Sequence, residues 1–128
     1  MEKKKILVVD DEKDLLLILK KGLSAEGYSV ITADNGHDGI ASARTKHPDL
    51  MILDRVLGDI QGEEVATRLR NDPITKNIPV IFLSALLSSP NNAERFTILD
   101  NSELIIKPYN FEDLIEAIQK YLRPKCIT

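Results

Sequence analysis

The sequence predicts an α/β fold in which a parallel β-sheet lies between two layers of helices. The run from Leu50 to Asp54 is apolar until its final carboxylate, which is typical of a strand buried on both faces. Other short apolar runs alternate with segments of helical periodicity along the chain. The length of 128 residues suits one hydrophobic core, so we expect a single domain over residues 1–128.

Apolar runs and turn residues place the individual elements. Residues 29–33 form the most polar strand, as expected at a sheet edge. Asn35-Gly36 predicts a turn before the second helix, and Asn110 predicts a cap before the last one. A fourth helix could begin at Ser88, with Phe96 and Leu99 as its apolar anchors. The expected strands are residues 5–9, 29–33, 50–54, 78–84 and 104–106, and the other expected helices are residues 14–23, 38–46, 62–70 and 110–122.

Composition narrows the possible functions. The chain is 43% hydrophobic and 29% charged, with a formal net charge of −3, so we expect no direct binding to nucleic acid. The cluster Lys3-Lys4-Lys5 is read as a solvated lead-in. No apolar stretch is long enough for a membrane span or a signal-peptide core. The single cysteine, Cys126, excludes an internal disulfide and fits a reducing cytoplasm, which is the location we expect.

Polar side chains gather at the carboxyl ends of the expected strands. In a flavodoxin-like (βα)5 sandwich the five parallel strands lie in the order 2-1-3-4-5, and ligands bind where the strand order reverses, beside strands one and three. The ends of these strands should therefore meet in one shallow pocket. The residues concerned are Asp10 and Asp11 after the first strand, Asp54 after the third, Ser84 after the fourth and Lys107 after the fifth.

Three carboxylates this close repel one another unless a cation lies among them. Hard oxygen ligands, with room for water, suit Mg²⁺ or Mn²⁺ better than zinc. Lys107 and Ser84 could then hold phosphoryl oxygens, and Asp54 could act as a nucleophile that forms an acyl phosphate. Each residue alone has a simpler reading, as a helix cap, a loop hydroxyl or a solvated lysine. Their convergence in this fold favours a functional site.

Four segments resemble the receiver domain of bacterial two-component response regulators. They are V-V-D-D-E at 8–12, L-M-I-L-D at 50–54, L-S-A at 83–85 and I-I-K-P-Y at 105–109, and the resemblance extends over essentially the whole chain. It implies that Asp54 accepts a phosphoryl group from a phosphohistidine on a sensor histidine kinase or a histidine phosphotransfer protein. Such domains catalyse their own phosphorylation and dephosphorylation and are not conventional enzymes.

The resemblance also implies roles for the other site residues. Asp11 would bind Mg²⁺ directly and Asp10 mainly through water, and Asp54 and the main-chain carbonyl of Val56 would be further ligands. Lys107 and Ser84 would contact the phosphoryl group, and the Lys107-Pro108 bond would be cis. A downstream protein would bind the face made by helix 4, strand 5 and helix 5, and the domain would be a monomer or weak dimer.

Some residues depart from the family pattern. Leu104 stands where the family has a switching aromatic residue, Gly58 replaces a common proline, and Asp100-Asn101 replaces a Gly-Ala pair. These departures leave open a pseudo-receiver, which would bind proteins without being phosphorylated. A flavin- or nucleotide-binding module is less favoured, because Asp10 and Asp11 would repel phosphate where such a module needs main-chain amides. No effector domain follows, so output would pass through protein contact, unless the chain is excised from a longer protein.

Overall fold

The computed structural model describes residues 3–55, 57–85, 102–107 and 109–122. Among the described residues up to 85, strands and helices alternate as the sequence predicts, and the described residues from 102 onward add one strand and one helix. The strands are β1 (Lys5–Val9), β2 (Ser29–Ala33), β3 (Leu50–Asp54), β4 (Val80–Ala85) and β5 (Ser102–Lys107), and the helices are α1 (Lys13–Ala25), α2 (Gly36–Lys46), α3 (Gly62–Arg70) and α5 (Phe111–Leu122).

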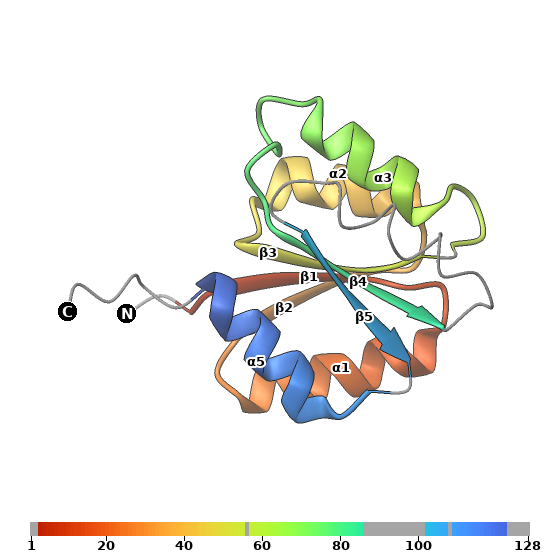
Figure 1. The fold of residues 1–128 in the computed structure, drawn as a ribbon. Helices are drawn as coiled ribbons and strands as arrows, with labels where there is room; N and C mark the ends of the chain where they lie inside the picture. Colours follow the sequence, from red (N-terminus) through yellow and green to blue (C-terminus); the bar gives the residue numbers. More distant parts are fainter. Residues whose placement is uncertain (1–2, 56, 86–101, 108, 123–128) are drawn as a thin grey trace.

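The five strands form one parallel sheet in the order β2-β1-β3-β4-β5 (Figure 1). This order confirms the flavodoxin-like prediction, including the reversal that places β1 beside β3. Val9 pairs with Leu53 across these two strands, so Asp10 and Asp54, which follow these two residues, lie at the same carboxyl end of the sheet. The polar strand β2 lies at one edge, as expected, and β5 lies at the other.

Two helical layers enclose the sheet, with α2 and α3 on one face and α1 and α5 on the other (Figure 1). Alternate residues of each strand point to opposite faces, so Leu7 and Val9 join the first layer while Ile6 and Val8 join the second. All five residues of β3 are buried, which explains its continuous apolar run. Among the described residues, no helix has the length and apolar character needed to cross a membrane.

Element boundaries differ from the predictions by a few residues. One correction concerns Asn35-Gly36, which caps and begins α2 instead of forming a separate turn, because the Asn35 side chain accepts a hydrogen bond from the Asp38 N–H at 2.8 Å. Strand β4 begins at Val80, two residues later than expected, and β5 extends over Ser102–Lys107. The predicted fourth helix, with Ser88, Phe96 and Leu99, lies outside the described residues.

The core of the α2–α3 layer depends on Phe82, which is fully buried on β4. Replacing it with alanine should lower the free energy of unfolding by about 3–5 kcal/mol, because apolar contacts are lost and a cavity remains. Urea denaturation monitored by circular dichroism measures the change. Ile74→Ala is the control, since Ile74 is 51% exposed and its truncation should change stability by less than about 0.5 kcal/mol.

Candidate functional site

The end of β1 fixes the first carboxylate of the site. Asp10 follows Val9 directly, and its backbone N–H donates to the Ala33 carbonyl at 3.1 Å. Its Oδ1 atom accepts a hydrogen bond from the Glu12 N–H at 2.9 Å, which orients the side chain at the start of α1. Asp10 is buried, whereas the neighbouring Asp11 is exposed to solvent.

Asp54 is the last residue of β3 and is also buried. The chain then makes a loop, residues 55–61, and returns so closely that Gly62 lies against the strand end. The Gly62 N–H donates to the Arg55 carbonyl at 2.8 Å. A Cβ atom at Gly62 would lie 2.6 Å from the main-chain oxygen of Asp54, so only glycine fits here without a shift of the backbone.

The three carboxylates meet as the topology predicts. Each of Asp10, Asp11 and Asp54 offers an oxygen atom, and these atoms lie within 4.8 Å of one another. Lys107, at the end of β5, reaches the same cluster: its Nζ atom lies 3.6 Å from Asp54 Oδ2 and 3.9 Å from Asp10 Oδ2. Residues from β1, β3 and β5 therefore share one electrostatic site.

Burial leaves Asp10 electrostatically strained. Burial is the main cause that raises its pKa, to about 7; the Glu12 N–H lowers it, the negative charge of Asp54 raises it further, and Lys107 lowers it. The Oδ2 atom of Asp10 is buried and accepts no hydrogen bond within the described part of the chain. A buried oxygen of this kind, beside two further carboxylates, fits a divalent cation, and a set of oxygen ligands alone suits Mg²⁺ or Mn²⁺.

The remaining predicted site residues stand as follows. Ser84 is buried on β4 and follows Leu83, the residue that pairs with Asp54. Ser84 therefore lies at the same carboxyl end of the sheet as Asp54. Val56 and the Lys107-Pro108 bond lie outside the described residues, and the predictions made for them stay predictions. Leu104 is partly buried and packs against the same apolar cluster as Phe82, so no aromatic ring occupies that position of β5.

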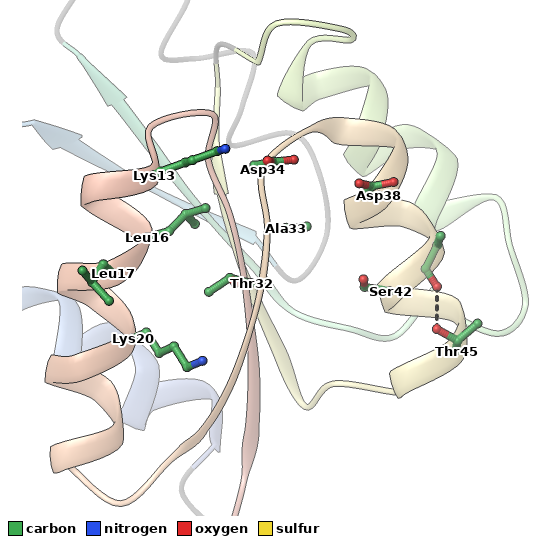
Figure 2. Close-up of a pocket in the computed structure, with 11 residues that line it drawn as sticks. Lys13, Leu16, Leu17, Lys20, Thr32, Ala33, Asp34, Asp38, Ser42 and Thr45 are labelled. Atoms are coloured by element: carbon green, nitrogen blue, oxygen red, sulfur yellow. Dashed lines mark hydrogen bonds between the residues drawn. The ribbon is translucent and has the colours of Figure 1, made fainter.

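A groove of about 610 Å³ lies elsewhere, between α1 and α2 over the edge of β2 (Figure 2). Lys13 and Lys20 line it from α1, and Asp34 and Asp38 line it from the side of α2. The residues of the acidic cluster do not line this groove. The candidate site at the carboxyl ends of the strands is therefore separate from this groove.

Comparison with known proteins identifies a family for the chain. The model of the response regulator receiver domain family matches residues 6–119. The chain belongs to this family. The receiver domain is 34% identical over 125 residues to a probable transcriptional regulator, ycf27, of Porphyridium aerugineum, with 96% of this chain and 50% of that protein covered. It is 33% identical over 119 residues to the phosphate regulon regulatory protein PhoB of Rhizobium meliloti, with 93% and 52% covered.

Solved structures resemble the receiver domain along nearly its whole length. The chemotaxis protein CheY4 of Vibrio cholerae superposes with a TM-score of 0.85 at 26% identity, with 94% of this chain and 100% of that chain covered. The chain spans about half the length of the curated relatives it matches. The resemblance noted from the sequence motifs is thus confirmed at the level of family and fold.

Sequence reasoning missed Asp59, which lies in the loop between β3 and α3. Its carboxylate accepts hydrogen bonds from the Gly36 and His37 N–H groups at the start of α2, at 2.8 and 2.9 Å. The bond to Gly36 joins residues 23 positions apart. No local motif marks such a contact, because it depends on how a loop and a helix meet in the folded chain.

The close approach at Gly62 gives a testable contrast with Gly58. Gly62→Ala should lower the free energy of unfolding by about 1–3 kcal/mol, because its methyl group collides with the backbone of Asp54. A Cβ atom at Gly58 would meet no described atom within 4 Å, and its φ is not positive, so Gly58→Ala should be neutral or stabilise by about 0.4–1 kcal/mol. Thermal and urea unfolding test this; equal effects of both substitutions contradict it.

The raised pKa of Asp10 predicts how the metal-free receiver domain responds to pH. The folded chain keeps this proton up to about pH 7, whereas the unfolded chain releases it near the ordinary value of 3.8. Between these limits the folded state binds more protons, so its stability should fall as pH rises, by about 1 kcal/mol per pH unit. Urea denaturation in chelator measures this slope. The Asp10→Asn variant cannot ionise at this position and should lose this dependence of stability on pH. An unchanged slope in that variant would contradict a raised pKa at Asp10.

Proposed function

We propose that this receiver domain is a phosphorylation switch or phosphorelay carrier in which Asp54 is the phosphoacceptor. The observation that carries the proposal is the cluster of Asp10, Asp11 and Asp54 with the Lys107 ammonium group beside it. The donor would be a phosphohistidine on a sensor histidine kinase or histidine phosphotransfer protein. The cytoplasmic location expected from the sequence stays a prediction.

The reaction transfers a phosphoryl group from nitrogen to oxygen. A carboxylate oxygen of Asp54 attacks phosphorus, the P–N bond to the donor histidine breaks, and the imidazole nitrogen keeps the electron pair and takes a proton from solvent. Asp10, Asp11 and Asp54 would hold Mg²⁺, with the Val56 carbonyl as a further ligand, and the ion would reduce the repulsion between the acidic cluster and the incoming phosphoryl group.

Lys107 and Ser84 would contact the transferred group. The Lys107 ammonium group already lies close to the carboxylates of Asp10 and Asp54. After phosphorylation it could bind a phosphoryl oxygen on Asp54 in place of the carboxylate. Ser84 occupies the strand between β3 and β5 at the same edge, from which a hydroxyl could donate a hydrogen bond. Phosphorylation would add a charge close to −2 at the site, which is enough to shift the equilibrium between two conformations of the domain.

The output would pass through β5 and α5, together with the predicted fourth helix. Glu103 on β5 pairs with Lys120 of α5 at 2.6 Å and accepts a hydrogen bond from the Tyr121 hydroxyl at 3.3 Å, which joins the two elements of this face. The downstream partner would be a protein. Leu104 excludes an aromatic rotamer switch on this strand, so the signal would depend on movement of the strand and on Lys107.

Leu104 also supports the second candidate, a pseudo-receiver that binds proteins without phosphorylation. The two candidates differ in what they require of the acidic cluster. A phosphoacceptor needs Asp10, Asp11 and Asp54 as metal ligands and nucleophile, whereas a pseudo-receiver does not. The buried, raised-pKa carboxylate of Asp10 destabilises the metal-free fold, and this cost favours the phosphoacceptor.

Incubation with acetyl phosphate and Mg²⁺, followed by intact mass spectrometry, tests the proposal. The wild-type chain should gain the mass of one phosphoryl group, and the gain should vanish with chelator and in Asp54→Ala. Lys107→Ala should bind Mg²⁺ but form the adduct about 100-fold more slowly, as expected when one group that stabilises developing charge is removed. A wild-type chain that forms no Mg²⁺-dependent adduct would count against the phosphoacceptor and favour the pseudo-receiver.

A further inference from the structure

Asp59 connects the loop after Asp54 to the start of α2. Its two carboxylate oxygens accept hydrogen bonds from consecutive N–H groups, Gly36 at 2.8 Å and His37 at 2.9 Å. The bonds from Gly36 first and His37 second hold the pKa of Asp59 well below its ordinary value, at about 2. Asn35, the residue just before α2, accepts the next N–H, that of Asp38, so Asp59 completes the cap from another part of the chain.

Packing reinforces this connection. A Cβ atom at Gly36 would lie 2.4 Å from Ile60 Cγ1, so the loop and the first turn of α2 are in direct contact. At its base, the loop is closed by the hydrogen bond from the Gly62 N–H to the Arg55 carbonyl. The loop is therefore held both beside Asp54 and at its tip.

Helix α2, whose first N–H groups bind Asp59, packs against β1. A Cβ atom at Gly39 would lie 2.9 Å from Val9 Cγ2, so α2 packs tightly on β1, the strand that Asp10 follows. A chain of contacts thus runs from β1 through α2 to Asp59 and on to the loop that begins after Asp54. It joins the two strands that carry the buried carboxylates, outside the sheet itself.

We propose that Asp59 is a positioning residue that holds the loop after Asp54 against α2 and thereby keeps the acidic cluster assembled for Mg²⁺. The inference rests on the proposed function, because it assumes that these carboxylates bind the ion. Asp10, Asp11 and Asp54 repel one another. Without Asp59, the loop is free to relax and the Asp54 carboxylate moves away from Asp10, so the site is no longer pre-organised and the ion must restore it on binding.

Asp72 offers a matched control at the opposite end of α2. It also lies in a loop beside α3, accepts the Ile74 N–H at 3.0 Å and pairs with Arg44 of α2 at 2.7 Å. Its removal costs the chain a similar set of contacts, but at the end of the sheet away from the acidic cluster. Asp59→Ala and Asp72→Ala therefore separate an effect on the site from a general loss of stability.

Two measurements test the inference. Calorimetric titration of Mg²⁺ should show a dissociation constant raised about 10-fold in Asp59→Ala, near the lower limit for losing a group that supports a metal ligand, and changed less than about twofold in Asp72→Ala. Hydrogen exchange without metal should show faster exchange of the Gly36 and His37 amides in Asp59→Ala but not in Asp72→Ala. Asp59→Asn, which keeps one acceptor oxygen, should bind Mg²⁺ about threefold more weakly than wild type.

The outcomes distinguish the inference from the proposed function. Should wild type bind no Mg²⁺, the proposed function fails and the inference falls with it, whatever the exchange rates show. Should wild type bind Mg²⁺ while Asp59→Ala and Asp59→Asn both keep its affinity, only the inference fails. An equal loss of affinity in Asp72→Ala would also overturn it, because the effect would then be one of overall stability.

Discussion

Mutual repulsion among three carboxylates is the constraint on which this structure depends. Oxygens of Asp10, Asp11 and Asp54 lie within 4.8 Å of one another, and two of these residues are buried. Such an arrangement lowers the stability of the chain unless a cation offsets the charge. Lys107 supplies part of that compensation from β5. The sheet, the glycines and the loop contacts then hold together a group of side chains that would otherwise separate.

The strand order of the sheet is the main reason that these carboxylates lie close together. Asp10 and Asp54 are far apart in the sequence but follow neighbouring strands, because the order reverses between β1 and β3. Their side chains are thus brought together by backbone hydrogen bonds that do not depend on charge. Gly62 then allows α3 to begin directly beside the end of β3. The fold provides the rigidity and the carboxylates provide the chemistry.

Much of this architecture follows from the sequence alone, for identifiable reasons. The buried strands are recognisable because both faces are covered, which makes β3 apolar throughout. The strand order then places Asp10, Asp11, Asp54 and Lys107 at one rim without knowledge of any side-chain contact. The role of Asp59 could not be predicted, since its partners lie in another element and depend on a close approach of loop and helix. The predicted start of α2 was wrong for a related reason: Asn35-Gly36 suits both a turn and a helix cap, and only the contact to Asp38 distinguishes them.

The glycines of α2 and α3 restrict how far these two helices can move. At Gly36, Gly39 and Gly62 these helices meet the loop and the strands at distances that leave no room for a methyl group. Interfaces so closely fitted resist sliding, because any displacement creates overlap at once. The edge strand β5 has a single neighbour in the sheet, is only partly buried, and takes part in none of these three glycine contacts. If the proposed function holds, a displacement that follows phosphorylation at Asp54 would therefore fall on β5, while the α2–α3 layer would keep its position.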